Sequence, residues 1–238
     1  IINNMKTSSV LLALVAAGMA TSVYSAEPFT VQHLVNMNKI HSYAVSNDGN
    51  TLVYGVKVID DKGEASSDLY ALDLTNKSAT PKQLTSAAGT EHDVSFAPDN
   101  KSIYFLADRS GSSQLFQLPL NGGEALQVTD LALDVNGYKL SQDGTQVVMT
   151  MRVFPECKDL ACSKEKFAAE KDRKTTGREY KQLMVRHWDT WEDHARNHLF
   201  VANINGKKIT DAVNVTQARD TETPPKPFSG MEEVTFSP

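Results

Sequence analysis

The side chains best suited to chemistry are gathered in one stretch, VRHWDTWEDHARNHLF, at residues 185–200. It contains both tryptophans of the chain, beside several carboxylates. Aromatic faces next to carboxylates can bind a cationic peptide amine by cation–π contact and ion pairing, so Trp188, Glu192 and Asp193 are candidate substrate-binding residues. The alternative, which we prefer for Trp188 and Trp191, is that these large side chains pack the segment onto the rest of the fold.

A second candidate site comprises the only two cysteines, Cys157 and Cys162, in the stretch CKDLAC. In an oxidising compartment, cysteines this close are expected to form a local disulfide that closes a small loop. A zinc site that also uses His194 and His198 is the alternative, because two thiolates and two imidazoles can hold zinc. The cysteine spacing is loose for zinc and His198 adjoins an expected strand, so we predict the disulfide and no metal site.

The sequence contains no self-contained catalytic motif. It has no Gly-x-Ser-x-Gly nucleophile elbow, no glycine-rich phosphate loop and no His-Glu-x-x-His helix, so we expect no catalytic residue and no cofactor in this chain. The net charge is −5, from 24 Lys and Arg against 29 Asp and Glu, and the cations are not clustered. Nucleic acid is therefore not an expected partner, since phosphate binding needs grouped cations.

The first 26 residues have the layout of upstream residues followed by a secretory signal peptide. Met5-Lys6 precedes an apolar stretch and a small-residue exit at Ser25 or Ala26. A membrane anchor is the competing interpretation, but the apolar stretch is interrupted by Gly18 and falls short of the ~20 residues that a membrane-spanning helix needs. The mature protein is therefore expected to be exported, periplasmic or secreted, with no membrane anchor once the signal is removed.

A repeat of three stretches organises the remaining chain, residues 27–238. Each stretch has a short strand, a polar turn, a longer apolar strand, a strand with Leu-Tyr or Leu-Phe and an outer strand that ends in Thr85, Thr129 or Thr216. The turns are centred on Asp48, Asp99 and Asp143. Four short strands per repeat of ~40–50 residues are typical of β-propeller blades rather than of an ordinary antiparallel sandwich.

The turns explain why the repeat tolerates different residues after the aspartate. A tight hairpin turn places one residue at positive φ, which glycine adopts at low cost. Gly49 and Gly144 follow Asp48 and Asp143, whereas Asn100 follows Asp99, and asparagine is the next most tolerant residue.

The third blade is interrupted by an insertion at residues 154–197. It holds the cysteines, a charged stretch with helix-forming residues and the tryptophan segment, and we predict one or two helices with a break at Gly177. The chain ends on EEVTFSP, which aligns with DVSFAP at residues 93–98, so a fourth blade is expected to begin there. The predicted class is all-β: a partial propeller of about three blades plus the first strand of a fourth, with a mainly helical insertion.

With these motifs in view, the chain resembles the N-terminal propeller of exported peptidases of the prolyl oligopeptidase family, including dipeptidyl-peptidase and acylaminoacyl-peptidase-like members. The blade starts SNDGNTLVYG, FAPDNKSIYFLAD and LSQDGTQVVM carry the resemblance, together with VRHWDTWEDHARNHLFV, which is more specific to the peptidases. It covers nearly all of residues 27–238.

The resemblance implies an α/β-hydrolase domain beyond residue 238, with a serine, an aspartate and a histidine, for which this piece restricts access and positions an oligopeptide substrate. In related dipeptidyl peptidases, acidic residues on a propeller insertion bind the free amine. Glu192 and Asp193 are similar to these by position. The alternative is a non-catalytic, TolB-like periplasmic propeller that binds protein partners.

Overall fold

The computed structural model describes residues 27–60, 62–180, 183, 185–217, 219–225 and 229–237. The predicted leader, residues 1–26, lies outside the described residues. The chain divides into two compact units, Ile1–Val35 and Asn36–Pro238. The described part of the first unit is short and includes most of helix α2 (Val31–Asn36), while the strands of the described residues all belong to the second unit.

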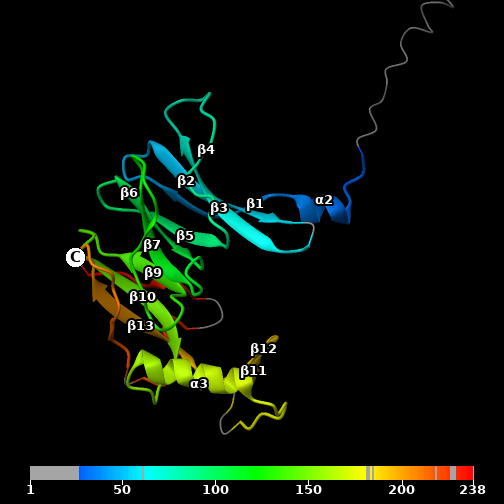
Figure 1. Cartoon of the computed structure of the whole chain (residues 1–238), viewed down its shortest axis with the longest axis vertical. Helices are drawn as coiled ribbons and strands as arrows, with labels where there is room; N and C mark the ends of the chain where they lie inside the picture. Colours follow the sequence, from blue (N-terminus) through cyan, green and yellow to red (C-terminus); the bar gives the residue numbers. More distant parts are fainter. Residues whose placement is uncertain are drawn as a thin grey trace, which may run out of the picture. The chain divides into compact units, whose positions relative to one another are not determined.

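The second unit contains three four-stranded antiparallel sheets, each built from strands in sequence order (Figure 1). The first sheet comprises β1 (Lys39–Val45), β2 (Thr51–Ile59), β3 (Ala65–Asp73) and β4 (Lys82–Gln83). The second comprises β5 (Glu91–Phe96), β6 (Ser102–Ala107), β7 (Gln114–Pro119) and β8 (Leu126–Gln127). The third comprises β9 (Gly137–Leu140), β10 (Gln146–Val153), β13 (Arg196–Asn203) and β14 (Val213–Asn214). These sheets confirm the three predicted blades.

The polar turns have the predicted backbone geometry. Gly49, Asn100 and Gly144 lie at φ 75°, 57° and 71°. In the third blade the Asp143 carboxylate accepts hydrogen bonds from the Ser141 hydroxyl and from the Thr145 backbone N–H, at 2.6 and 3.0 Å. Such side-chain bonds to the local chain are the reason that aspartate recurs at this turn.

The threonine that ends each repeat has a structural role. Its Oγ1 accepts a hydrogen bond from the backbone N–H of the leucine in the third strand, which the short fourth strand leaves without a strand partner. The pairs are Thr85–Leu69 at 2.8 Å, Thr129–Leu115 at 2.8 Å and Thr216–Leu199 at 3.0 Å. A buried N–H without an acceptor is costly, which accounts for threonine at all three positions.

Successive sheets pack face to face through two apolar cores. One core joins the first and second sheets around Val53, Leu69 and Phe105, and the other joins the second and third around Leu115 and Met149. The innermost strands also touch in turn. The pairs are Ser42 Oγ with the Val94 N–H, and Ser95 Oγ with the Tyr138 hydroxyl. This succession of contacts around a common axis is the arrangement of propeller blades.

The insertion leaves the third sheet and returns to it at neighbouring positions, since Val153 and Arg196 are register partners in the β10–β13 pair. It contains helix α3 (Leu160–Asp172) and a small hairpin of β11 (Arg186–His187) and β12 (Thr190–Trp191). "Mainly helical" was therefore too strong a prediction, because the helix ends before Gly177, ahead of the β-branched pair Thr175-Thr176. Strand β13 also begins at Arg196, slightly before the predicted end of the insertion.

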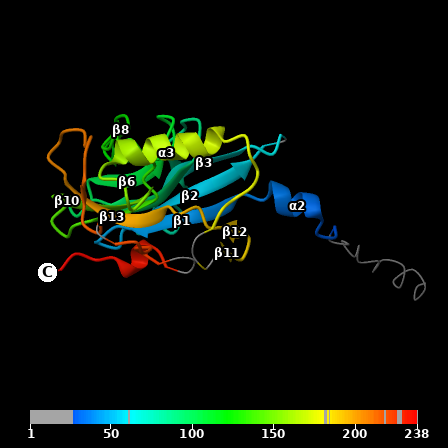
Figure 2. The same cartoon turned by 90° about the horizontal axis from the view of Figure 1, so that it is seen from below.

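The predicted first strand of a fourth blade needs correction. Met231–Glu233 form the short 3-10 helix η1, and residues 234–237 are not in a strand. A strand requires a hydrogen-bonded neighbour, and no described strand pairs with this segment. It does lie against β9, where the Lys139 ammonium donates to the Val234 carbonyl. Figure 2 shows α3 and the segment that carries η1 on different sides of the strands.

Candidate functional site

The insertion is fastened to the end of β10 by covalent and apolar contacts. Cys157 and Cys162 form a disulfide, with their Cα atoms 5.6 Å apart. The Asp159 carboxylate caps α3 by accepting from the Cys162 N–H at 2.8 Å. The rings of Phe154 and Phe167 lie 4.9 Å apart in a small buried cluster with Cys157. The first part of the insertion is thus a rigid platform.

The zinc alternative does not fit these contacts. The two sulfur atoms are bonded to each other, and the buried His198 ring uses both nitrogens: Nε2 contacts the Arg219 carbonyl at 2.9 Å and Nδ1 the Asn214 amide at 3.0 Å. Burial lowers the pKa of His198, so the ring is neutral near pH 7. The described residues contain no group of three or more side chains arranged to hold a metal.

The tryptophan segment forms a hairpin, with β11 and β12 paired in its stem and Trp188 in its turn. Arg186 pairs with Trp191, His187 pairs with Thr190, and the Glu192 N–H extends the ladder to the Val185 carbonyl. Trp188 occupies the tip at φ 50°, a conformation that is unusual for a bulky residue.

The preferred interpretation of the tryptophans, that they pack the insertion onto the propeller, is wrong. Trp188 is 72% exposed and Trp191 is 49% exposed. Trp191 packs within the insertion instead, against the Tyr180 ring at 6.1 Å and under the Arg186 guanidinium at 5.2 Å. β11 and β12 pair only with each other and join none of the four-stranded sheets, which agrees with the exposure of both tryptophans.

Glu192 and Asp193, at the foot of the hairpin, are held by the chain through one oxygen each. Glu192 Oε1 accepts from the His194 N–H at 2.8 Å and from Arg196 Nη1 at 2.6 Å. Asp193 Oδ1 accepts from Arg152 Nη2 at 2.6 Å and from the Ala195 N–H at 3.2 Å. Among the described residues, no donor reaches Glu192 Oε2 or Asp193 Oδ2. Each carboxylate is oriented and still has acceptor capacity.

Further carboxylates give this region an excess of negative charge. Arg196 also pairs with Asp220 at 3.1 Å, and the next residue's N–H donates to Glu222 at 2.8 Å. We call Glu192, Asp193, Asp220 and Glu222, with Arg152 and Arg196, the carboxylate cluster. Among Glu192, Asp193 and Asp220, three carboxylates against the two guanidinium groups leave one negative charge in excess. Burial raises the pKa of Glu192, but its bonds to Arg196 and to backbone N–H groups outweigh this and lower the pKa overall, so the group is ionised at neutral pH.

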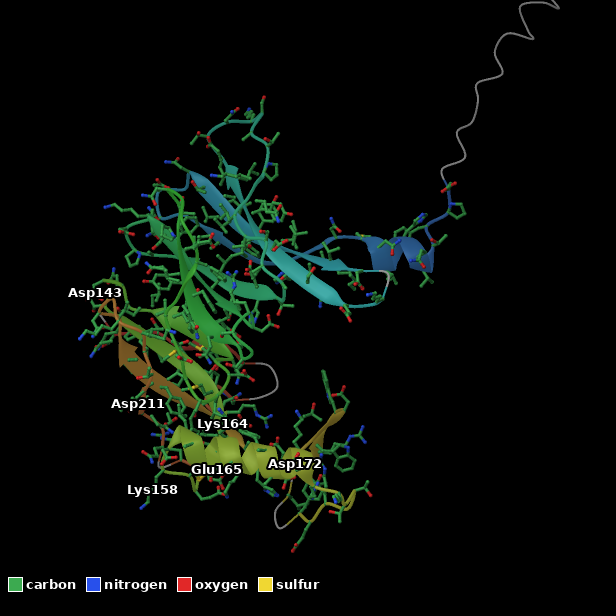
Figure 3. The ribbon with its side chains drawn as sticks, viewed as in Figure 1. Asp143, Lys158, Lys164, Glu165, Asp172 and Asp211 are labelled. Atoms are coloured by element: carbon green, nitrogen blue, oxygen red, sulfur yellow. A yellow bond between two sulfur atoms is a disulfide. The ribbon has the colours of Figure 1, made fainter. Side chains whose placement is uncertain are left out.

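A cleft of about 610 Å³ lies beside the carboxylate cluster, between the second blade and α3. Arg152, which pairs with Asp193, lines it together with Lys164 and Phe167 of α3. Figure 3 labels Lys164 on the side of α3 nearest the strands. The opposite wall is formed by the β6–β7 turn at residues 110–112 and the connection at residues 130–134. A second cavity of about 490 Å³, lined by Asp93 and Glu232, adjoins this cleft at Asn136.

The sequence names Glu192, Asp193 and Trp188 as candidate residues, but sequence reasoning missed the cationic partners of the two carboxylates. Arg152 is the one charged residue of strand β10 and lies next to the start of the insertion, and that position was a signal visible in the sequence. Arg196 and Lys164 gave no comparable signal, because a cation in a polar segment is ordinarily a solvated side chain.

Two dipeptidyl-peptidases match nearly the whole chain. It is 31% identical over 99% of its length to dipeptidyl-peptidase 5 of Porphyromonas gingivalis, and 28% identical over 97% of its length to dipeptidyl-peptidase 5 of Porphyromonas endodontalis. The chain spans 34% of the length of each of these relatives. The match therefore includes the blades and the insertion.

A solved structure and a family model agree on the fold. Acylaminoacyl peptidase of Pyrococcus horikoshii superposes with a TM-score of 0.53 at 12% identity, over 76% of this chain and 25% of that one. Residues 22–177 match the family model described as PD40, TolB beta propeller domain. Together with the three consecutive four-stranded sheets, this match shows that the chain belongs to the TolB β-propeller (PD40) family.

Proposed function

We propose that this chain is the propeller portion of an exported exopeptidase that removes short units from oligopeptides, and that the carboxylate cluster holds the amino terminus of the substrate. The similarity to two dipeptidyl-peptidases over nearly the whole chain supports the class of enzyme. The predicted signal sequence supports export. The bond-breaking groups would belong to the part of such an enzyme that this chain does not span.

The observation that carries the proposal is the state of Glu192 and Asp193. A carboxylate binds an ammonium best when it is already oriented, because less side-chain freedom is lost on binding. Arg196 and Arg152 supply that orientation through Oε1 and Oδ1, which leaves Oε2 and Oδ2 available. The excess of negative charge favours a cationic ligand, and hydrogen bonds between charged groups are the stronger ones.

In the full-length enzyme, substrate binding and bond cleavage would then be carried out by different parts of the protein. The propeller would bind the free amine and limit access, whereas a serine activated by a histidine would form the acyl-enzyme. Holding the amine fixes how many residues reach the serine, which is how an exopeptidase measures the unit it removes. The exposed Trp188 and Trp191 would flank the peptide on the hairpin side.

The test is to compare Glu192→Gln with Glu165→Gln in the full-length native enzyme, on chromogenic dipeptide substrates with a free or an acetylated amine. Glutamine can still accept from Arg196 but carries no charge, so the fold is preserved while ammonium binding weakens. We expect kcat/KM on the free-amine substrate to fall by about tenfold or more, the equivalent of ~1.4 kcal/mol or more. Glu165 is an exposed residue of α3, and its variant should behave as the wild type.

Equal activity of Glu192→Gln and wild type on free-amine substrates would contradict the proposed role of the cluster. Turnover of dipeptide substrates by residues 27–238 alone would contradict the division of labour, since it would place the catalytic groups within this chain.

A non-catalytic binding propeller is the second candidate, and the family match to the TolB β-propeller domain favours it. The two candidates differ in the length of the native polypeptide. Because the chain spans 34% of the dipeptidyl-peptidases, an antibody against it should detect a native protein about three times as long if the peptidase proposal is right. A native protein of propeller length, without peptidase activity, would favour the binding propeller.

A further inference from the structure

We infer that the cleft between the second blade and α3 is a specificity subsite for an acidic side chain on the first residue of the peptide. The inference rests on the proposed function, because it assumes that the amine is held by Glu192 and Asp193. It adds which side chain the neighbouring cleft prefers. The argument has three steps: the position of the cleft, the charge of its inner wall and the hydrogen bonds that this wall leaves unmade.

Position comes first. Arg152 is shared by the two features, since its Nη2 pairs with Asp193 Oδ1 and its side chain lines the cleft. An ammonium on Asp193 Oδ2 would therefore sit roughly 5 Å from the guanidinium, given ordinary hydrogen-bond lengths. The carboxylate of an aspartate or glutamate extends a similar distance from its own amine. The side chain of the first residue is thus the part of the peptide that reaches the cleft.

The inner wall of the cleft is cationic. Arg152 and Lys164 both line it, and the Phe167 ring beside them can contact the methylene groups of a ligand side chain. Lys164 is exposed, and no described residue forms an ion pair with it. Arg152 has a single side-chain partner among the described residues, Asp193, which it meets through Nη2, and its side chain remains 36% exposed. A guanidinium that still has N–H groups without acceptors can bind a ligand rich in oxygen atoms, and a carboxylate fits its geometry best.

The opposite wall carries Asp130 and Asp134, which could instead attract a basic side chain. Asp130 pairs with Lys208 at 3.7 Å, whereas Asp134 Oδ1 accepts only from the Ser113 N–H at 2.8 Å, which leaves its negative charge in place. Asp134 and Lys164 therefore face the cleft from opposite walls as opposite charges that no described residue pairs. An anionic side chain is favoured at the wall of Arg152 and Lys164, which is the wall nearest the amine.

The experiment measures binding of Glu-Ala-Ala, Gln-Ala-Ala and Lys-Ala-Ala amides to the purified chain by its intrinsic fluorescence, since both tryptophans lie in the hairpin beside the cluster. The glutamate peptide should bind about tenfold more tightly than the glutamine peptide, and the lysine peptide should bind most weakly. Lys164→Met should reduce the preference for glutamate over glutamine several-fold. The matched control is Lys171→Met, which removes the same charge from the same helix outside the cleft.

The outcomes separate the two proposals. If Lys164→Met leaves the glutamate preference unchanged, or if the lysine peptide binds best, the subsite is wrong even though the amine site can still hold. If acetylated peptides bind as well as free ones, the amine site is wrong, whatever the glutamate preference. Absence of binding by every peptide at millimolar concentration overturns both.

Discussion

Substitution of Thr129 by valine tests the structural role of the threonine that closes each blade. The side chain is fully buried, and its Oγ1 accepts from the Leu115 N–H while its hydroxyl donates to Gln114 Oε1, each at 2.8 Å. Valine has the same shape, so no cavity forms and the change isolates the hydrogen bonds. Because Gln114 Oε1 retains the Leu131 N–H at 3.0 Å, the main cost is the unsatisfied Leu115 N–H.

A buried donor left without an acceptor costs ~1–3 kcal/mol, and we expect about 2 kcal/mol for Thr129→Val once the weakened Gln114 contact is included. For a domain of this length, that corresponds to a fall in Tm of about 4–8 °C. Thr216→Val should cost about 1 kcal/mol or less, because Thr216 is only half-buried and water can reach the Leu199 N–H.

Thermal unfolding followed by circular dichroism measures these differences, with the exposed Thr210→Val as the control. From the highest Tm to the lowest, the expected order is Thr210→Val, Thr216→Val and Thr129→Val. A Thr129→Val protein that melts with the Thr210→Val control would refute the reasoning. It would mean that the repeated threonine is not needed for the hydrogen bonding of the strand.

Two further predictions concern other parts of the chain. The hydrogen bond from Ser141 lowers the pKa of the Asp143 carboxyl to about 2, below its value in the unfolded chain, so this contribution to stability is lost as pH falls from ~4 towards 2. Ser141→Ala should raise the pKa of Asp143 in a carbon-13 NMR titration. An unchanged titration midpoint would contradict this. Tyr43 is 74% exposed on β1 together with other exposed apolar side chains, so we expect the isolated chain to self-associate through this surface. Tyr43→Lys should reduce that self-association in sedimentation experiments, and an unchanged degree of association would point to another surface.

The repeat was predictable because its determinants are local. Asn100 at positive φ and the hydrogen-bonded Asp143 turn depend on residues a few positions apart, which a single sequence displays. The end of α3 was less predictable, because the charged residues after Asp172 are acceptable in a helix or in a loop, and packing decides between the two.

The candidate site was predictable only in part. Glu192, Asp193 and Trp188 stand together in the sequence, so their grouping was visible. Arg152, the partner of Asp193, lies 41 positions before it and meets it because β10 and β13 pair along their whole length. The exposure of Trp188 could not be inferred either, since an indole is compatible with a core or with a projecting hairpin tip, and only the tertiary fold distinguishes them.

The pairing of Val153 with Arg196 has a consequence for how proteins of this kind can diverge. The pairing of β10 with β13 requires only that Arg196 return beside Val153, and it does not depend on the length of the segment between them. The entropy of closing such a loop rises only slowly with its length. The insertion can therefore vary in length and sequence, apart from the residues that pack against the sheets, such as Leu160 and Phe154. On the proposed function, changes in the residues between these two positions would alter substrate preference while the strand pairing of the blades is kept.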